Sequence, residues 1–244
     1  MVSELVSFIK KNNFLIFLIF YTPVLVLAET IIDDYRRYDV TKTKFILEKS
    51  AKDLSYPWAL SFIDKTNVVI TEKDGGLYKV DVLSGKKQKI KHNIPHIGYD
   101  GGGQGGLLDV YFNPSDDYIY FTYSHKSSKL TRSKQLSKKS STAIARGRLI
   151  ENEIKDFEIL LIAKPEFLEN RHYGSRIAIK GDDLFVSFGE RGQGMISQDP
   201  SKHPGSIIRI KTDGAIPQDN PHFIEKKDWL PEIYAIGVRN PQGI

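Results

Sequence analysis

Four short segments carry side chains that could do chemistry, and all four lie among glycines and prolines that are typical of loops. One of them, Arg-His-Tyr-Gly-Ser-Arg, holds His172 just before an apolar run of strand length. Imidazole side chains titrate near neutral pH, so His172 could be a general base that accepts a hydroxyl proton. A single loop histidine is more often structural or simply exposed, and both interpretations stay open on this residue alone.

A second segment, Gly-Val-Arg-Asn-Pro-Gln-Gly, places Arg239 and Asn240 at the end of another apolar run. The fixed donors of a guanidinium stabilise developing oxyanion charge, so Arg239 could polarise a carbonyl or quinone oxygen. An arginine that merely stabilises a turn is the alternative. Taken singly, this segment indicates no particular reaction.

A third segment, residues 99–106, places five glycines around Gln104. Such a loop brings backbone close to a ligand and presents one amide that both donates and accepts hydrogen bonds, whereas a flexible turn is the alternative. It is not a phosphate-binding loop, because no Lys-Ser or Lys-Thr pair follows the last glycine. The fourth segment, residues 189–192 followed by 198–203, is a charged loop between strands, suited to holding the top of one structural repeat together.

The composition excludes several classes of protein. The 244 residues include no cysteine, which rules out thiol nucleophiles, disulfides, iron–sulfur clusters and cysteine-ligated zinc. The histidines other than His172 are scattered, without the spacing or the paired carboxylates of a metal site. The formal net charge of +5 is mild, and the one dense basic cluster, within residues 126–139, is typical of a solvated loop. We therefore expect no nucleic-acid partner.

Apolar and β-branched runs of strand length follow one another along the chain, with turn residues between them. A first set of four lies within residues 58–91, a second within 107–162, and a third within 176–210 with a weaker fourth member at 222–230. A new set opens at residues 233–237. Sets of four strands are typical of β-propeller blades, with a sandwich or barrel as the rival. The sequence thus predicts an all-β, propeller-like fold with about three blades and the first strand of a fourth.

The N-terminus has the pattern of an export signal. Lys10 and Lys11 precede an apolar run over residues 14–27, which at about 1.5 Å per residue is too short to span a hydrocarbon core of ~30 Å as a helix. Ala28 supplies a small residue before a cleavage site. We expect residues 1–28 to be a signal peptide and the rest to be exported, to the periplasm or the outer membrane surface. An uncleaved membrane anchor is the alternative.

Five motifs in a fixed order carry a resemblance to a known family. They are residues 104–110, 172–177, 189–191, 213–214 with 217–221, and 231–235 leading into 239–243; residues 57–60 and 146–149 match the same pattern. Together they strongly resemble the soluble sugar dehydrogenases that depend on pyrroloquinoline quinone (PQQ), the glucose/sorbosone dehydrogenase family, and within it the broad-range aldose dehydrogenases. The resemblance covers about residues 50–244.

The resemblance implies a six-bladed propeller with PQQ over its central mouth and calcium bridging to that cofactor. It implies an oxidoreductase that oxidises aldose sugars at the anomeric C–OH to lactones, by hydride transfer to PQQ, and passes electrons to a periplasmic acceptor. His172 would be the base, and Arg239 would face the reactive quinone oxygen. Asn240 would contact the cofactor, and Gln104 would contact the sugar.

The chain departs from the family pattern at several points. Arg171 stands where the glucose-preferring enzymes carry an aspartate, so that sugar contact does not carry over, and Val238 replaces a histidine frequent before the Arg-Asn pair. The calcium ligands of the family lie beyond Ile244, so no metal ligand is assigned. The resemblance implies that residues 29–244 are the N-terminal part of the domain. A non-catalytic propeller fragment, or a module that binds a sugar or another partner, is the alternative function.

Overall fold

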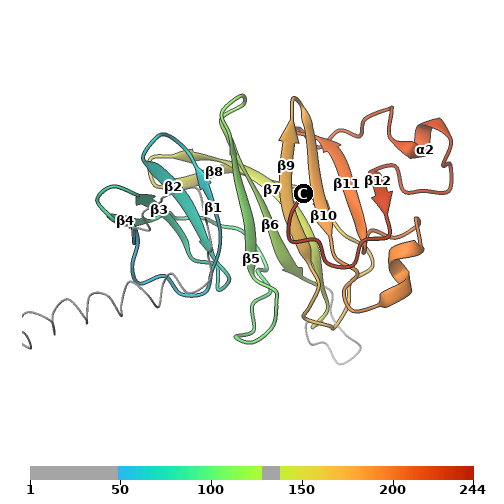
Figure 1. Ribbon diagram of the computed structural model, residues 1–244, viewed down its shortest axis with the longest axis horizontal. Helices are drawn as coiled ribbons and strands as arrows, with labels where there is room; N and C mark the ends of the chain where they lie inside the picture. Colours follow the sequence, from blue (N-terminus) through green and yellow to red (C-terminus); the bar gives the residue numbers. More distant parts are fainter. Residues whose placement is uncertain (1–48, 128–137) are drawn as a thin grey trace, which may run out of the picture. The chain divides into compact units, whose positions relative to one another are not determined.

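Three four-stranded antiparallel sheets make up the computed structural model, which describes residues 49–127 and 138–244 (Figure 1). Each sheet uses four strands that follow one another in the chain, so neighbours in sequence are neighbours in the sheet. The predicted all-β, propeller-like fold is confirmed. The predicted signal peptide lies outside the described residues, as do residues 128–137 of the segment that holds the basic cluster.

The first two sheets form where the apolar runs predict them. The first contains β1 (Pro57–Phe62), β2 (Asn67–Glu72), β3 (Leu77–Asp81) and β4 (Lys87–Lys89). The second contains β5 (Leu107–Asn113), β6 (Tyr118–Lys126), β7 (Ser140–Ile150) and β8 (Glu153–Ile162).

The third sheet departs from the prediction in its last strand. It contains β9 (Gly174–Lys180), β10 (Asp183–Phe188), β11 (Ser206–Lys211) and β12 (Ile233–Ile236). The segment at 233–237, predicted to open a fourth blade, is therefore the outer strand of the third sheet. The residues at 222–230, predicted as a weak strand, form the short helix α2 (Pro221–Ile224) and turns.

The connection before β12 has a physical reason for its shape. Pro221 starts α2, where the missing N–H of a proline costs nothing. The Asn220 amide donates to the carbonyls of Arg209 and Pro231, at 2.9 and 2.8 Å, and so folds the connection back onto β11. Ile233 then pairs with Ile208 and is fully buried beside it. This burial, which no local sequence pattern reveals, assigns β12 to the third sheet.

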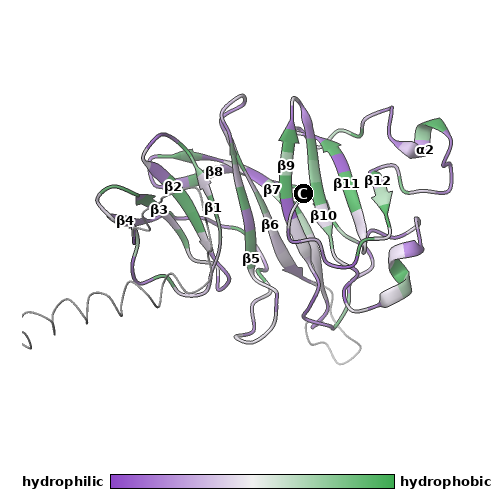
Figure 2. Ribbon diagram, viewed as in Figure 1, coloured by the Kyte–Doolittle hydropathy of each residue, from purple (hydrophilic) through white to green (hydrophobic). Residues whose placement is uncertain are grey.

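The middle sheet buries both of its faces, because side chains on a strand point alternately to opposite sides. On β6, Phe121 packs against the first sheet, whereas its neighbour Tyr120 packs against the third. On β7, Ala145 likewise packs against the first sheet and Ile144 against the third. Figure 2 shows the apolar residues concentrated along the strands and the polar residues in the connecting loops. The three sheets thus share two continuous apolar cores.

Each sheet is tied to the next repeat by a hydroxyl on its second strand. The bonds run from Thr71 to the carbonyl of Leu108 (2.6 Å), from Thr122 to that of Ser175 (2.7 Å), and from Ser187 to that of Pro241 (3.3 Å). Leu108 and Ser175 belong to the first strands of the second and third sheets. Pro241 therefore occupies the corresponding position for the segment that follows β12. Residues 240–242, rather than 233–237, lie where a further first strand would begin.

Candidate active site

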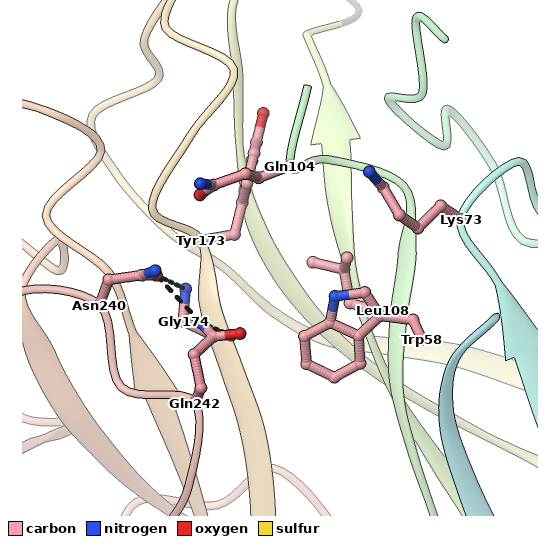
Figure 3. Close-up of a pocket in the computed structure, with 8 residues that line it drawn as sticks. All are labelled: Trp58, Lys73, Gln104, Leu108, Tyr173, Gly174, Asn240 and Gln242. Carbon is pink, nitrogen blue, oxygen red and sulfur yellow. Dashed lines mark hydrogen bonds between the residues drawn. The ribbon is translucent and has the colours of Figure 1, made fainter. Parts of the chain in front are cut away.

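A cavity of ≈ 390 Å³ lies where the starts of these repeats meet (Figure 3). Figure 3 shows Lys73 and Trp58 on one side and Asn240 and Gln242 on the other. The full lining is Trp58, Lys73, Gln104, Leu108, Tyr173, Gly174, Asn240 and Gln242. All three sheets and the segment after β12 contribute to this pocket, so it depends on the fold rather than on any one loop.

His172 is held at the edge of this pocket by a carboxylate. Its Nδ1 hydrogen-bonds to Oε1 of Glu190, and the two side chains are 13% and 4% exposed. Burial by itself would raise the pKa of Glu190, but hydrogen bonds from His172 and from the Gly194 amide (2.7 Å) outweigh it and hold that pKa below its usual value. Because an ionised carboxylate only accepts hydrogen bonds, Nδ1 is the donor. Among the described residues Nε2 has no partner, so it is the nitrogen left to accept a proton.

Gln104 lies directly beside this histidine. The side-chain Oε1 of Gln104 accepts a hydrogen bond from the backbone N–H of His172 at 2.7 Å. The backbone N–H of Gln104 donates to the carbonyl of Asn170 at 2.9 Å. A Cβ at Gly103 would lie 2.1 Å from the Asn170 amide, and one at Gly105 would lie 2.6 Å from the Gly98 carbonyl. These glycines therefore permit close packing that aims Gln104 at the site.

Asn240 forms part of the pocket wall. Its Oδ1 accepts hydrogen bonds from the Gly174 amide (3.0 Å) and from the Gln242 side chain (3.2 Å). Arg239 is connected differently: its carbonyl accepts the Glu190 N–H at 2.8 Å, while its exposed guanidinium makes no hydrogen bond or ion pair within the described residues. The structure thus brings His172, Gln104 and Asn240 together. It places the Arg239 backbone beside them, but not the guanidinium in the pocket lining.

Asp109 and Arg176, two charged residues within the recognised motifs, join the second and third sheets below the site. Asp109 is buried and accepts the Ile177 N–H at 2.8 Å, and Arg176 pairs with it at 3.4 Å. Burial raises the pKa of Asp109, and the Ile177 amide and Arg176 only partly oppose that effect. These contacts fix the start of β9, which follows His172 immediately.

Arg191 holds the loop that carries the histidine. It is buried and donates to the carbonyls of Ser140 (2.7 Å) and Arg171 (3.0 Å), with its guanidinium 3.7 Å from the Tyr173 ring centroid. The backbone of His172 lies in the left-handed region, at φ 53°, and needs such support. Arg191 therefore ties the loop that carries His172 to β7 of the second sheet, rather than holding one blade together as predicted for residues 189–192.

Glu190 is a partner of His172 that the sequence does not reveal. The sequence shows a carboxylate between glycine and arginine in a loop after a strand, which is also what an ordinary charged turn looks like. Its partner His172 is 18 positions away in the chain, so no local spacing joins the two.

The described residues show neither a metal site nor a membrane span. Within residues 49–127 and 138–244, no three side chains of histidine, cysteine, aspartate or glutamate gather closely enough to hold a metal ion. No helix in that part of the chain is long and apolar enough to cross a membrane.

Comparison with known families identifies the class of protein to which this propeller-like chain belongs. The model of the glucose/sorbosone dehydrogenase family matches residues 54–244. The chain therefore belongs to the glucose/sorbosone dehydrogenase family.

Individual relatives agree with this assignment. The aldose sugar dehydrogenase YliI of Escherichia coli strain K12 is 32% identical over 198 residues, which cover 78% of this chain and 50% of that protein. The quinoprotein glucose dehydrogenase B of Acinetobacter calcoaceticus is 26% identical over 216 residues, covering 79% and 44%. The apo-form crystal structure of the soluble aldose sugar dehydrogenase from Escherichia coli superposes with a TM-score of 0.67 at 30% identity, covering 79% and 54%. The chain spans about half the length of these relatives.

Proposed function

We propose that this protein is a sugar dehydrogenase that oxidises aldoses at the anomeric C–OH to lactones, with PQQ as the electron acceptor. The observation that carries the proposal is the Glu190–His172 pair, which leaves Nε2 without a partner among the described residues. The backbone of His172 bonds to Gln104, and the next two residues, Tyr173 and Gly174, line the pocket. The family assignment supports the sugar substrate, and the quinoprotein among the relatives supports the cofactor.

The chain's own residues would perform the proton transfer. Nε2 of His172 accepts the proton of the anomeric hydroxyl, so that an N–H bond forms as the O–H bond breaks. The ionised Glu190 then stabilises the positive charge on the imidazole, because it already accepts the Nδ1 hydrogen. The Oε1 of Gln104 is occupied by the His172 amide, which leaves its side-chain N–H groups to donate to sugar hydroxyls.

The pocket has the chemistry that a planar, carboxylate-bearing quinone requires. Asn240 and Gln242 present amides, and Trp58 presents an indole, to one cavity. These residues would hold PQQ there, and we expect Arg239 to turn its free guanidinium to the reactive quinone oxygen. When bound, the quinone supplies the two-electron acceptor for the hydride that leaves the anomeric carbon.

The described residues contain no cluster of acidic or imidazole side chains that would hold calcium. Calcium takes six to eight oxygen ligands, and the described part of the chain offers no cluster of three carboxylate or imidazole side chains. We therefore derive no step through calcium, and the metal remains an expectation from the resemblance.

The direct test is an assay of the purified full chain loaded with PQQ, with and without added calcium. Glucose, galactose and xylose would be offered in turn, with reduction of an artificial dye as the readout and lactone identified in the product. Dye reduction that depends on both sugar and PQQ would support the proposal. PQQ bound at full occupancy, without turnover of any aldose, would overturn it.

We also propose that the protein works outside the cytoplasm, where a periplasmic carrier would accept its electrons. The apolar run at residues 14–27 and Ala28 support this proposal. N-terminal sequencing of the protein from its native cells should give Glu29 as the first residue. A mature protein that still begins at Met1 would contradict cleavage.

A further inference from the structure

Lys73 contributes a positive charge to the pocket that no motif of the resemblance includes. It follows β2 in the first sheet and lines the cavity opposite Asn240, as Figure 3 shows. Its Nζ donates to the carbonyl of Gly103, the residue before Gln104, and lies 5.3 Å from the centre of the Tyr99 ring. The ammonium is therefore oriented into the same space as the sugar-facing amide.

Among the described residues, no carboxylate forms an ion pair with this ammonium. Lys73 forms no ion pair with any described residue, and the nearby carboxylates are engaged elsewhere: Asp100 accepts the Gly102 and Gly103 amides, at 3.3 and 3.2 Å. Glu72, the preceding residue, is buried and accepts the Ser55 amide at 2.6 Å.

Two other partly buried cations of the same fold are paired with acids. Arg209 binds Asp183 at 2.6 Å, and Arg146 binds Glu158 at 2.9 Å. Lysine has three N–H donors, and the Gly103 carbonyl uses one of them, which leaves two for a ligand. A half-buried ammonium with open donors in a cavity is suited to an anion, because the attraction gains from partial exclusion of water.

We propose that Lys73 forms an anion subsite of this pocket and binds a carboxylate group of its ligand. The flat face of Trp58 lies in the same wall and suits a ring to which that carboxylate is attached. The carboxylate belongs either to the quinone cofactor or to an acidic aldose such as a uronic acid. The inference rests on the proposed function for its choice of ligands.

Lys73→Gln is the informative variant, because glutamine keeps an N–H donor for the Gly103 carbonyl but removes the charge. Lys79→Gln is the matched control: Lys79 belongs to the same sheet and lines a separate cavity of ≈ 230 Å³ that also contains Asp81. Lys73→Arg keeps the positive charge and should retain most of the carboxylate binding that Lys73→Gln loses.

Two measurements distinguish the sources of the carboxylate. The first titrates PQQ into the apo-protein and follows binding by fluorescence quenching, which needs no catalysis. The second compares kcat/KM for glucuronate and galacturonate with that for glucose and galactose. We expect Lys73→Gln to weaken one of the two carboxylate-dependent quantities about 10-fold to 100-fold, and Lys79→Gln to change neither.

The two outcomes assign the subsite. Weakened PQQ binding places a cofactor carboxylate on Lys73, whereas loss confined to the uronates places a substrate carboxylate there. PQQ affinity and uronate preference that are both unchanged in Lys73→Gln would overturn the inference. Failure of every aldose to react while PQQ still binds would overturn the proposed function. Binding of PQQ and binding of glucuronate, each followed by fluorescence without turnover, would then decide the role of Lys73.

Discussion

Two histidine–glutamate pairs lie in the third repeat of this protein. They differ in whether the second ring nitrogen of the histidine has a hydrogen-bond partner. The Nδ1–H of His172 donates a hydrogen bond to Glu190, and the Nε2 of His172 has no partner among the described residues. The Nε2–H of His203 donates a hydrogen bond to Glu232 at 2.6 Å, and its Nδ1 accepts one from the backbone N–H of Lys164 at 2.9 Å. Both carboxylates have a lowered pKa, because the hydrogen bonds from their histidines outweigh the effect of burial.

If His172 is the base, as we propose, this difference separates it from a purely structural contact. His203 is 5% exposed, has both ring nitrogens occupied and packs edge-on against Phe188, so it can only hold the loop between β10 and β11 in place. His172 has the same partner chemistry, but it keeps one nitrogen open beside a cavity. A carboxylate beside a histidine is therefore not itself evidence of catalysis. The vacant nitrogen and its position are the evidence.

The largest expected effect follows replacement of His172. His172→Asn keeps a residue that tolerates the left-handed backbone at this position, at φ 53°, but removes the base. We expect kcat to fall about 100-fold to 10,000-fold, the usual contribution of a general base, with PQQ affinity unchanged. Dye-reduction kinetics on protein of measured PQQ content would check this, and a kcat within a few-fold of wild type would remove His172 from the role of base.

Replacement of Glu190 should have the next largest effect. Glu190→Gln keeps the size of the side chain but removes the charge that stabilises the protonated imidazole. We expect kcat to fall on the order of 10-fold to 100-fold, with KM for the aldose little changed. The comparison variant is Glu232→Gln, measured per folded molecule, for which kcat should stay near wild type. Equal losses in the two variants would mean that Glu190 acts only on the fold.

The second pair should affect stability rather than turnover. His203→Asn leaves the partly buried Glu232 carboxylate and the Lys164 amide without their partner. We expect the free energy of unfolding to fall by about 1–3 kcal/mol, measured by urea denaturation at neutral pH. A loss of kcat per folded molecule as large as that of His172→Asn would contradict the division between the two pairs.

A smaller effect should appear in the pH dependence of stability. The pKa of Glu232 in the folded protein lies below its ordinary value of 4.5, so its contribution is complete above pH 4.5 and is lost as the pH falls through the folded pKa. Glu232→Gln has no such contribution to lose. The difference in unfolding free energy between wild type and this variant should therefore shrink on acidification below pH 4.5, and a difference that grows would reverse the assigned sign.

The fold could be predicted from the sequence where alternation and turn residues coincide. Runs such as Asn67–Glu72 and Tyr118–Lys126 are strongly β-forming and are bounded by turns, so the first two sheets appear where expected. The prediction was wrong for Ile233–Ile236, because strand pairing across a long connection depends on tertiary contacts. The burial of Ile233 against Ile208 and the bridge made by Asn220 decide that pairing.

The site was predictable only in part, for a related reason. His172, Gln104 and Asn240 stand in recognisable motifs, and the structure brings them to one place. Glu190 and Lys73 are ordinary charged loop residues until folding sets one against an imidazole and the other into a cavity. Their roles come from geometry between distant segments, which residue types alone do not encode.

Chemical rescue tests the central claim most directly. In His172→Gly, glycine accepts the left-handed backbone and leaves space where the imidazole stood. With PQQ bound and saturating aldose, added imidazole should restore dye reduction in proportion to its concentration, while the activity of His203→Gly should not respond to it. No rescue in His172→Gly, or equal stimulation of both variants, would contradict the assignment of His172 as the base.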